Sequence, residues 1–398
     1  MTYDWKWNTQ PKETWQEVYL LDMAQPVSQA WLRGIFAEMA GWGVSYFKLD
    51  FLNGGSVAPL SFSREARNAY RRRDGEQMRL GLRAIREGAG ENAYLLGCNL
   101  PISHGLGLLS GIFTAIDVGN ATGSFAHLKS RMTTLISRYY QQKRFWHNDP
   151  DVLYLGGAFL DPSDVCSIGE ARIRATAVAL CGGPVLLGDD LTTLPEERLD
   201  MYTLCLPAYG VSARPVDLFK NEYPRIWDLK VATDWGGWDV VGLFNYDGEE
   251  ASIRVLFEDL GLNGDREYVV WEFWDQEFLG PHRGYVDTPV MGESARVLSI
   301  REVQDHPMVL STGFHLTQGG VELSEVEWDG AQKVLSGTCR RAKGAEGQIF
   351  LYVPEGFRAV DLDVDEGAVG DLGADGTIHE VQLKMEQEQT RWRVWFER

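Results

Sequence analysis

Short apolar runs alternate with longer amphipathic stretches in the first half of the chain. The apolar runs fit buried strands, and the stretches between them fit helices. Leu32, Ile35, Phe36 and Met39 follow one another at the spacing of a helical stripe, and Ser28 is the expected N-cap. Six strands are predicted, at residues 17–22, 44–50, 94–98, 112–117, 144–150 and 184–188.

This alternation is typical of parallel strands joined by helical crossovers. Helices are expected between the strands, near residues 63–73, 76–87, 124–143, 168–180 and 195–204. A closed barrel of this kind needs eight strand–helix units, and about six can be recognised. The fold class expected for residues 1–215 is therefore α/β, a partial (β/α)8 TIM barrel, truncated at its N-terminus, that carries the catalytic domain.

The pattern changes after about residue 215 to a period of two, with Gly and Asp turns about every ten residues. Residues 238–244 and 391–396 are examples of such alternating runs. This pattern predicts antiparallel β-sandwich material in the C-terminal half. We expect a β-sandwich domain over residues 216–310 and a further β-rich subdomain over residues 311–398.

The charge of the chain restricts its partners. The 398 residues carry a formal net charge of −19, which disfavours binding to nucleic acid or to an anionic membrane. A neutral substrate fits this charge better than an anion. The sequence leaves homo-oligomer formation open.

The cysteines indicate a reducing compartment. The chain has five cysteines at wide spacings and no CxxC motif, so a disulfide framework or a zinc site is not expected. The seven histidines also show no metal-ligand spacing, and no metal or other cofactor is expected. The N-terminal residues do not read as a signal peptide, and no run of 18 apolar residues occurs. A cytoplasmic location is the resulting expectation.

Carboxylates follow several of the predicted strands. Asp22, Asp50 and Asp117 each end an apolar run, and Asp149 and Asp151 flank a proline after another. Strand ends that each deliver an acid to one place are how a (β/α)8 barrel builds an active site. Two ionisable groups on one buried strand, such as Lys48 and Asp50, are costly unless they are paired or in use.

These segments together resemble the α-galactosidases and melibiases of glycoside hydrolase families 36 and 27. The order and spacing of the motifs carry the resemblance, which covers about residues 15–320. The motifs are Tyr46-Phe-Lys-Leu-Asp50-Phe, Tyr94-Leu-Leu-Gly-Cys98-Asn-Leu-Pro101, Gly107-Leu-Leu with Ile116-Asp117-Val118, Asn148-Asp-Pro-Asp151, Leu187-Gly-Asp-Asp190 and Arg214-Pro-Val-Asp217-Leu-Phe. Bacterial relatives often carry an arginine four residues before the acid of the third motif, where this chain has Phe113.

The resemblance implies a retaining exo-glycosidase that hydrolyses terminal α-galactosyl residues by double displacement. Such a reaction needs one ionised carboxylate and one proton donor about 5–5.5 Å apart. Asp50 matches the nucleophile and Asp117 the acid/base, and the apolar neighbours of Asp117 favour a raised pKa. Lys48 shares a strand face with Asp50 and favours its ionised form. A structural ion pair at Lys48 and a capping role for Asp117 are the alternatives.

Five residues are predicted to bind the substrate. Lys48 and Asp22 are expected to bond sugar hydroxyls, although Asp22 could equally hold backbone amides. Cys98 is expected near a hydroxyl, with an inert buried thiol as the alternative. Trp146 could stack on the sugar or belong to the core. Asp151 is favoured over Asp149 for substrate contact.

Other functions remain open at this point. A transglycosylase, or a glycosidase for α-N-acetylgalactosaminides or β-L-arabinopyranosides, would use the same scaffold. A second class is a magnesium enzyme that binds the ion through Asp22, Asp50 and Asp117. A third is a catalytically impaired remnant that only binds carbohydrate or has a structural role.

Overall fold

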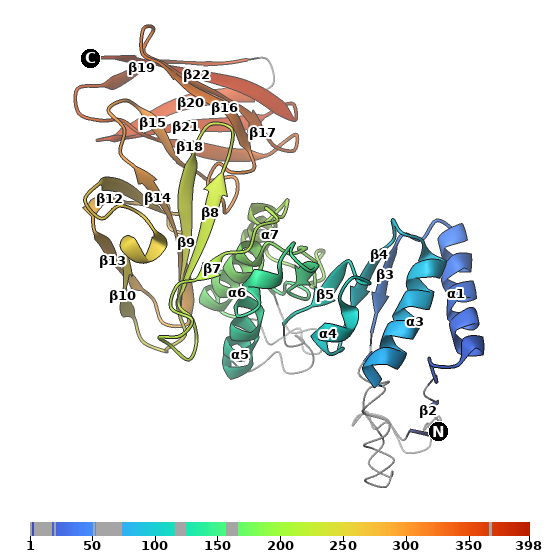
Figure 1. Ribbon diagram of the computed structural model, residues 1–398. Helices are drawn as coiled ribbons and strands as arrows, with labels where there is room; N and C mark the ends of the chain where they lie inside the picture. The colour runs from blue at the N-terminus through green and yellow to red at the C-terminus, as the bar shows by residue number, and fades with distance from the viewer. Residues whose placement is uncertain are drawn as a thin grey trace. The chain divides into compact units, whose positions relative to one another are not determined.

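The computed structural model describes residues 2–3, 18–19, 21–50, 52, 74–115, 125–156, 166–365 and 368–398. The chain divides into two compact units (Figure 1). The first consists of Met1–Thr114 and Lys143–Asp149, and the second of Ala115–Gln142 and Pro150–Arg398. The domain boundaries predicted at residues 215 and 310 remain predictions.

A parallel sheet is the centre of the first unit. Its strand order is β3-β4-β5-β6, and all three pairings are parallel. The strands are β3 (Tyr46–Leu49), β4 (Tyr94–Gly97), β5 (Gly111–Phe113) and β6 (His147–Asp149). β3, β4 and β6 lie within predicted strands, because the apolar runs at these places bury one or both faces of the sheet. β5 starts one residue before the strand predicted at 112–117 and ends at Phe113.

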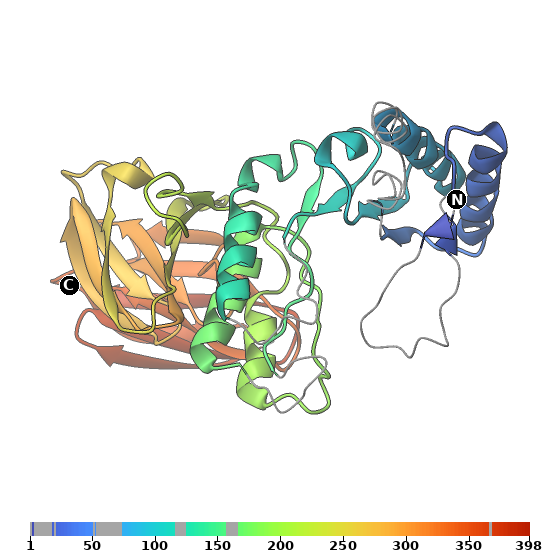
Figure 2. The ribbon, with the colours of Figure 1, turned by 90° about the horizontal axis from the view of Figure 1, so that it is seen from below.

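Two long helices cover one face of this sheet. They are α1 (Pro26–Gly41) and α3 (Asp74–Ala89), which lie side by side (Figures 1 and 2), and a short helix α4 (Ile102–Gly105) follows β4. Phe47 and Leu49 of β3 share a hydrophobic core with Met78 and Leu82 of α3. Gly88 allows the close approach of the helices, since a Cβ there would lie 2.3 Å from the carbonyl oxygen of Arg33.

The structure corrects the start of the first helix. Pro26 occupies the first helical turn and Gln25 is the N-cap, whereas the predicted N-cap Ser28 lies buried inside α1. A proline is favoured at this position because its fixed φ suits the first turn and its missing N–H costs no hydrogen bond. The predicted end is correct, since the helix stops at Gly41 and Gly43 adopts a φ of 94°.

The first and last predicted strands of the barrel also differ from expectation. Within 17–22, the described strand is β2 (Val18–Tyr19), which pairs antiparallel with β1 (Thr2–Tyr3). Within 184–188, Leu187 forms an isolated parallel bridge with Leu153. Apolar runs of this length identify a buried segment, but its pairing partner depends on distant residues.

Three helices of the second unit follow the predicted positions. They are α5 (Phe125–Ile136), α6 (Ile168–Cys181) and α7 (Glu196–Leu204), with a 3₁₀ turn at Tyr139–Gln141. A capping box between Ser167 and Glu170 starts α6, and Gly182 in the left-handed region ends it.

An antiparallel sheet of six strands follows these helices, in the order β12-β11-β14-β9-β8-β7. Its strands are β7 (Arg214–Pro215), β8 (Ile226–Ala232), β9 (Gly237–Asn245), β11 (Glu267–Glu272), β12 (Glu277–Arg283) and β14 (Ser294–Glu302). A second sheet pairs β10 (Ala251–Leu256) with β13 (Tyr285–Val290). A hydrophobic core that includes Val241, Val255 and Val286 joins the two sheets.

Two further sheets of four strands complete the chain (Figures 1 and 2). Side chains from both sheets share one hydrophobic core. The first contains β15 (Met308–Thr312), β18 (Glu346–Tyr352), β20 (Ala368–Asp375) and β21 (Ile378–Met385). The second contains β16 (Leu323–Asp329), β17 (Val334–Arg340), β19 (Arg358–Val364) and β22 (Gln389–Glu397). Trp392 at the centre of this core is fully buried.

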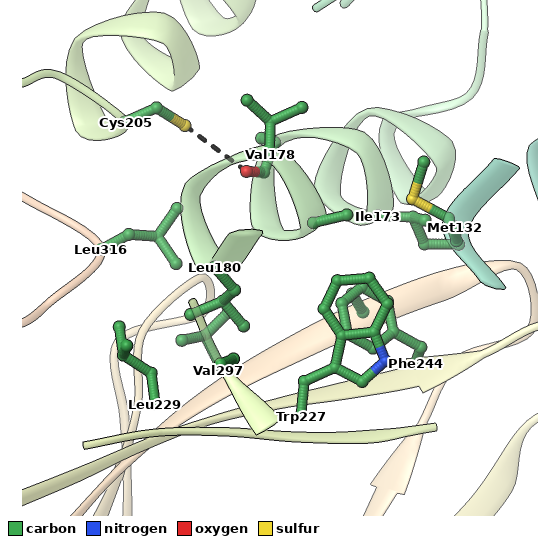
Figure 3. Close-up of a cluster of buried hydrophobic side chains, with 14 of the residues drawn as sticks. Met132, Ile173, Val178, Leu180, Cys205, Trp227, Leu229, Phe244, Val297 and Leu316 are labelled. Atoms are coloured by element: carbon green, nitrogen blue, oxygen red, sulfur yellow. Dashed lines mark hydrogen bonds between the residues drawn. The ribbon is translucent and has the colours of Figure 1, made fainter. Parts of the chain in front are cut away.

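The largest core of the second unit joins its helices to the six-stranded sheet (Figure 3). Ile173 and Leu180 of α6 lie over Trp227 and Phe244, whose rings are 4.4 Å apart. Cys205 belongs to the same core, and its thiol donates to the carbonyl of Ala175.

A partly buried carboxylate holds the segment before α6 to α7. Asp189 accepts hydrogen bonds from the backbone N–H groups of Leu155 (2.6 Å) and Gly156 (3.0 Å) and from the hydroxyl of Tyr202 (2.5 Å). The hydroxyl lies at the same distance from the carbonyl of Leu153. Asp189 thus has a structural role in this unit, as its position after a strand allows.

Asp239 of β9 makes the stability of the second unit dependent on pH. Burial, and then the neighbouring Asp228, raise the pKa of its carboxyl to about 7, although Lys230 bonds to it. Lys230 also contacts Asp228 (3.2 Å), and Arg214 approaches that carboxylate from the surface (3.5 Å). The folded pKa of Asp239 exceeds the unfolded value of about 4, so the folded state holds the proton more tightly than the unfolded state. The stabilisation that this proton gives the fold is complete below pH 4 and is lost as the pH rises through 7.

We therefore expect the free energy of unfolding to fall, by on the order of 1–3 kcal/mol, between pH 4 and pH 8. Asp239→Asn should flatten this slope, because the amide does not titrate. Urea unfolding at several pH values measures it, with exposed Glu355→Gln as the control that keeps the slope. An unchanged slope in Asp239→Asn would contradict the assignment.

Candidate active site

One face of the parallel sheet in the first unit, the polar face, carries polar side chains and tyrosines beside Leu96 and Phe113. Phe47 and Leu49 of β3 pack against the helices, so Tyr46 and Lys48 point to the opposite face. Asp50 follows directly after β3 and continues this polar row at the carboxyl end of the strand. Carboxyl ends of parallel strands are where barrel enzymes place their catalytic groups.

The segment after β4 approaches Asp50. The pairing Leu49–Gly97 continues with a hydrogen bond from the backbone N–H of Cys98 to the carbonyl of Leu49 (2.8 Å), so Cys98 lies next to Asp50. The side-chain amide of the following residue, Asn99, donates to Oδ1 of Asp50 (3.1 Å). Asn99 has a φ of 57°, a left-handed conformation that asparagine tolerates better than most residues. This bond fixes the orientation of the Asp50 carboxylate.

A second carboxylate, Asp149, belongs to the same face. It ends β6 opposite Phe113 of β5 and is fully buried. The backbone N–H and the hydroxyl of Thr114 both donate to the backbone carbonyl oxygen of Asp149, at 3.0 and 3.1 Å. These two bonds hold this strand end in place.

The charges on this face shift the pKa values of two tyrosines, Tyr46 and Tyr94. Burial raises the pKa of Tyr46, the charge of Asp149 adds to the rise, and Lys48 opposes it. Burial, followed by Tyr46 and Asp149, raises the pKa of Tyr94 to about 12. The two rings are stacked with centroids 5.3 Å apart. Lys48 and Asp149 therefore act within electrostatic reach of the same phenol.

A glycine makes room for this tyrosine pair. A Cβ on Gly111 of β5 would lie 2.3 Å from the Tyr94 hydroxyl, so a larger residue there would displace the ring. His147 of β6 flanks Tyr94 at a centroid distance of 5.9 Å. The face thus combines a fixed carboxylate, a lysine, a buried carboxylate and aromatic rings. Such a combination can bind a polar, uncharged ring and attack it with a carboxylate.

The predicted site residues fall into different places. Lys48, Asp50 and Cys98 lie together on the polar face, and Cys98 is buried. Asp22 is exposed and accepts hydrogen bonds from the backbone N–H of Ala24 (3.0 Å) and the side chain of Gln25 (3.1 Å). These contacts lie within its own turn and agree with the structural alternative for Asp22.

Trp146 is not part of the polar face, and substrate contact by Asp151 stays a prediction from the sequence. Trp146 precedes β6, at the end of the strand remote from Asp149, and only 3% of its surface is exposed. This position suits the core interpretation better than stacking on a sugar. Asp151 belongs to the second unit, and Arg131 holds the backbone around it through the carbonyls of Pro150 (2.6 Å) and Val152 (3.0 Å).

The predicted acid/base Asp117 lies outside the described residues, so its role remains a prediction from the sequence. The same limit applies to the predicted magnesium site, which includes Asp117. Within the part of the chain that the structure describes, no group of three or more His, Cys, Asp or Glu side chains is placed to hold a metal ion.

Asp149 lies on the polar face and Asn99 contacts Asp50, although neither is among the residues predicted for the site. The sequence favours Asp151 over Asp149 for substrate contact, whereas the pairing of Phe113 with Asp149 places Asp149 on the polar face. Asn99 follows directly after the predicted strand end, and an asparagine at that place was the available signal.

No protein-family model matches the chain. Among curated proteins, it is 21% identical over 178 residues to a probable alpha-galactosidase of Dictyostelium discoideum. The match covers 42% of this chain and 44% of that relative, so the chain spans less than half of the relative's length.

Solved structures of glycosidases share the fold. A family 27 β-L-arabinopyranosidase of Geobacillus stearothermophilus, in complex with arabinose, aligns with a TM-score of 0.57 at 17% identity. The alignment covers 72% of this chain and 65% of that protein. Alpha-galactosidase I of Mortierella vinacea aligns with a TM-score of 0.50 at 14% identity and covers 67% and 70% of the two chains.

These similarities confirm the predicted fold class, a TIM-barrel region followed by antiparallel β-sandwich material. They support the predicted resemblance for family 27 and do not confirm it for family 36. At such identities the structural likeness shows the fold alone.

Proposed function

We propose that the protein is a retaining exo-glycosidase that removes terminal α-galactosyl residues from oligosaccharides. The observation that carries the proposal is the arrangement at the end of β3. Asp50 follows Lys48 on one polar face, and Asn99 fixes the carboxylate from the neighbouring strand end. The sequence match to a probable alpha-galactosidase supports this substrate class.

In the first step, a carboxylate oxygen of Asp50 forms a bond to the anomeric carbon while the bond to the leaving oxygen breaks. Asp117 gives its proton to that leaving oxygen. In the second step, Asp117 takes a proton from water, the water oxygen bonds to the anomeric carbon, and Asp50 leaves as a carboxylate. Two inversions at one carbon give net retention.

The described residues explain why Asp50 suits the first role. Its carboxylate is exposed at the end of a strand whose other side is anchored in the core by Phe47 and Leu49. Asn99 orients this carboxylate, and Lys48 lies on the same face of the strand. A nucleophile held on a rigid strand loses little entropy on reaching the transition state.

Substrate contacts follow from the same face. We propose that Lys48 and Asp149 bond sugar hydroxyls and that Cys98 lies close to one of them. Asp22 and Asp151 remain proposed substrate contacts from the sequence. Acceptor sugars could replace water in the second step, which would give transglycosylation on the same residues.

The test compares nitrophenyl glycosides with the purified protein. We expect α-galactoside to be cleaved at least about tenfold faster than α-N-acetylgalactosaminide, β-L-arabinopyranoside and α-glucoside, and proton NMR to show α-galactose as the first product. Release of β-galactose would contradict double displacement. Absence of turnover on every glycoside would favour the non-catalytic alternative.

A further inference from the structure

A cleft with a volume of about 520 Å³ opens in the second unit. It lies between the β8–β9 hairpin, the loop after β14 and strand β16. All of its lining residues belong to the second unit, so they differ from the residues of the polar face around Asp50. A volume of this size is typical of pockets for small organic ligands.

Aromatic rings form much of the lining. Trp235 and Trp238 on the hairpin have centroids 4.7 Å apart. Across the cleft, His306 stacks on Trp328 with centroids 5.3 Å apart and an interplanar angle of 2°. Phe357 packs edge-on against Trp328 and holds its ring in place. Rings with such fixed orientations offer flat, amphipathic surfaces at a low cost in entropy.

Polar groups lie between these rings. Glu327 is exposed, and its carboxylate has no hydrogen-bond or ion-pair partner within the described residues. In the same part of the chain, Nε1 of Trp328 has no described acceptor, and of the His306 ring nitrogens only Nδ1 has a described partner, the carbonyl of Pro307. Donors and an acceptor therefore remain available beside the aromatic surfaces.

The cationic group of the cleft is already engaged. The guanidinium of Arg301 lies 3.6 Å from the ring centroid of Trp238 and bonds Ser299 (3.1 Å) and the carbonyl of Gln318 (2.5 Å). The side chain is also buried. Together with Glu327 and the net charge of the chain, this makes the cleft unsuited to an anion.

We propose that this cleft binds a neutral oligosaccharide, as a second sugar site that is distinct from the proposed catalytic face. Indole faces pack on the apolar C–H faces of sugar rings, and Glu327, His306 and the Trp328 indole N–H bond their hydroxyls. A smaller pocket of about 240 Å³ shares His306 and Trp328, and its lining carries charges of both signs from Asp305, Lys333 and Arg398.

The test is direct binding of the neutral trisaccharides raffinose and panose, measured by tryptophan fluorescence and calorimetry. Asp50→Asn serves as the background, so that hydrolysis does not consume the ligand. We expect binding that does not weaken in 0.5 M salt and that is absent with the anionic trigalacturonate. Binding of neither neutral trisaccharide, or tighter binding of trigalacturonate, would overturn the proposal.

Three variants locate the site. His306→Ala and Glu327→Gln are each expected to raise Kd at least about fivefold, and Gly236→Arg to abolish binding in the cleft. A side chain fits at Gly236 without strain, since no atom lies within 4 Å of a Cβ there and its φ is not in the left-handed region. Unchanged binding in all three folded variants would overturn the proposal.

Trp42→Ala is the matched control, because this tryptophan is 72% exposed and lies in the first unit. It is expected to keep the trisaccharide affinity. In an otherwise wild-type chain, the cleft variants are expected to retain kcat/KM on nitrophenyl α-galactoside. In the chain without cleft substitutions, absence of turnover together with trisaccharide binding would refute the catalytic proposal alone. Turnover without trisaccharide binding would refute the cleft alone.

Discussion

Asp50→Asn is expected to lower the turnover of nitrophenyl α-galactoside at least about 1000-fold. The amide is nearly isosteric with the carboxylate, and it can still contact Asn99, so the fold should be retained. It cannot form the covalent bond to the anomeric carbon, which removes the first step of the reaction. Initial rates with purified protein measure the effect.

Azide gives this prediction a chemical signature. In Asp50→Ala, the space left by the carboxylate admits azide, which attacks the anomeric carbon once and gives the inverted β-galactosyl azide. Glu87→Gln is the control, since this carboxylate also lies in the first unit and pairs with Arg33 at the surface. Near-wild-type turnover in Asp50→Asn would exclude Asp50 as the nucleophile.

Asp117→Asn is expected to cause the second large loss, of about 100- to 10,000-fold on substrates with a sugar leaving group. Such a leaving group needs a proton, which the amide cannot supply. Nitrophenol leaves without help, so on nitrophenyl α-galactoside the first step should survive and the second should become limiting. The time course of nitrophenol release is expected to show a burst followed by slow turnover.

Azide again separates the roles of the two residues. In Asp117→Asn it should accelerate the second step and give the retained α-galactosyl azide, because the intermediate on Asp50 has already undergone one inversion. Asp190→Asn is the matched control, since this exposed carboxylate bonds, among the described residues, only Thr192 within its own turn. A β-configured azide product from Asp117→Asn would reverse the assignment of the two roles.

The strand faces of the first unit could be predicted because side chains alternate along a strand. The order Tyr46, Phe47, Lys48, Leu49 places the two apolar residues together, and the structure packs both against the helices. The same rule places Lys48 and Asp50 on one face. The local alternation of side chains is therefore enough to predict that Lys48 lies on the same strand face as the proposed nucleophile Asp50.

Pairing across strands could not be predicted in the same way. Val18–Tyr19 is apolar enough for a central strand, but its partner Thr2–Tyr3 is polar and runs antiparallel. Asp149 and Asp151 differ only in register, which the distant strand β5 decides through Phe113. Register depends on long-range contacts, and a single sequence contains little information about them.

The aromatic cleft was hidden for a related reason. Trp235 lies in the turn between β8 and β9 and Trp328 in β16, which are far apart in the sequence, and His306 lies in the loop after β14. A tryptophan in a β-rich sequence is most simply explained as core, and Trp227 and Trp392 are indeed fully buried. Only the folded arrangement separates the residues of the cleft from those of the core.

The carboxylate of Asp189 has a consequence for local opening of the chain. The amide hydrogens of Leu155 and Gly156 bond to a side chain rather than to a neighbouring strand, and Tyr202 of α7 completes the cluster. These amides can exchange with deuterium only when the cluster opens. Their exchange should therefore follow that of helix α7, so that a loop and a helix open as one cooperative unit.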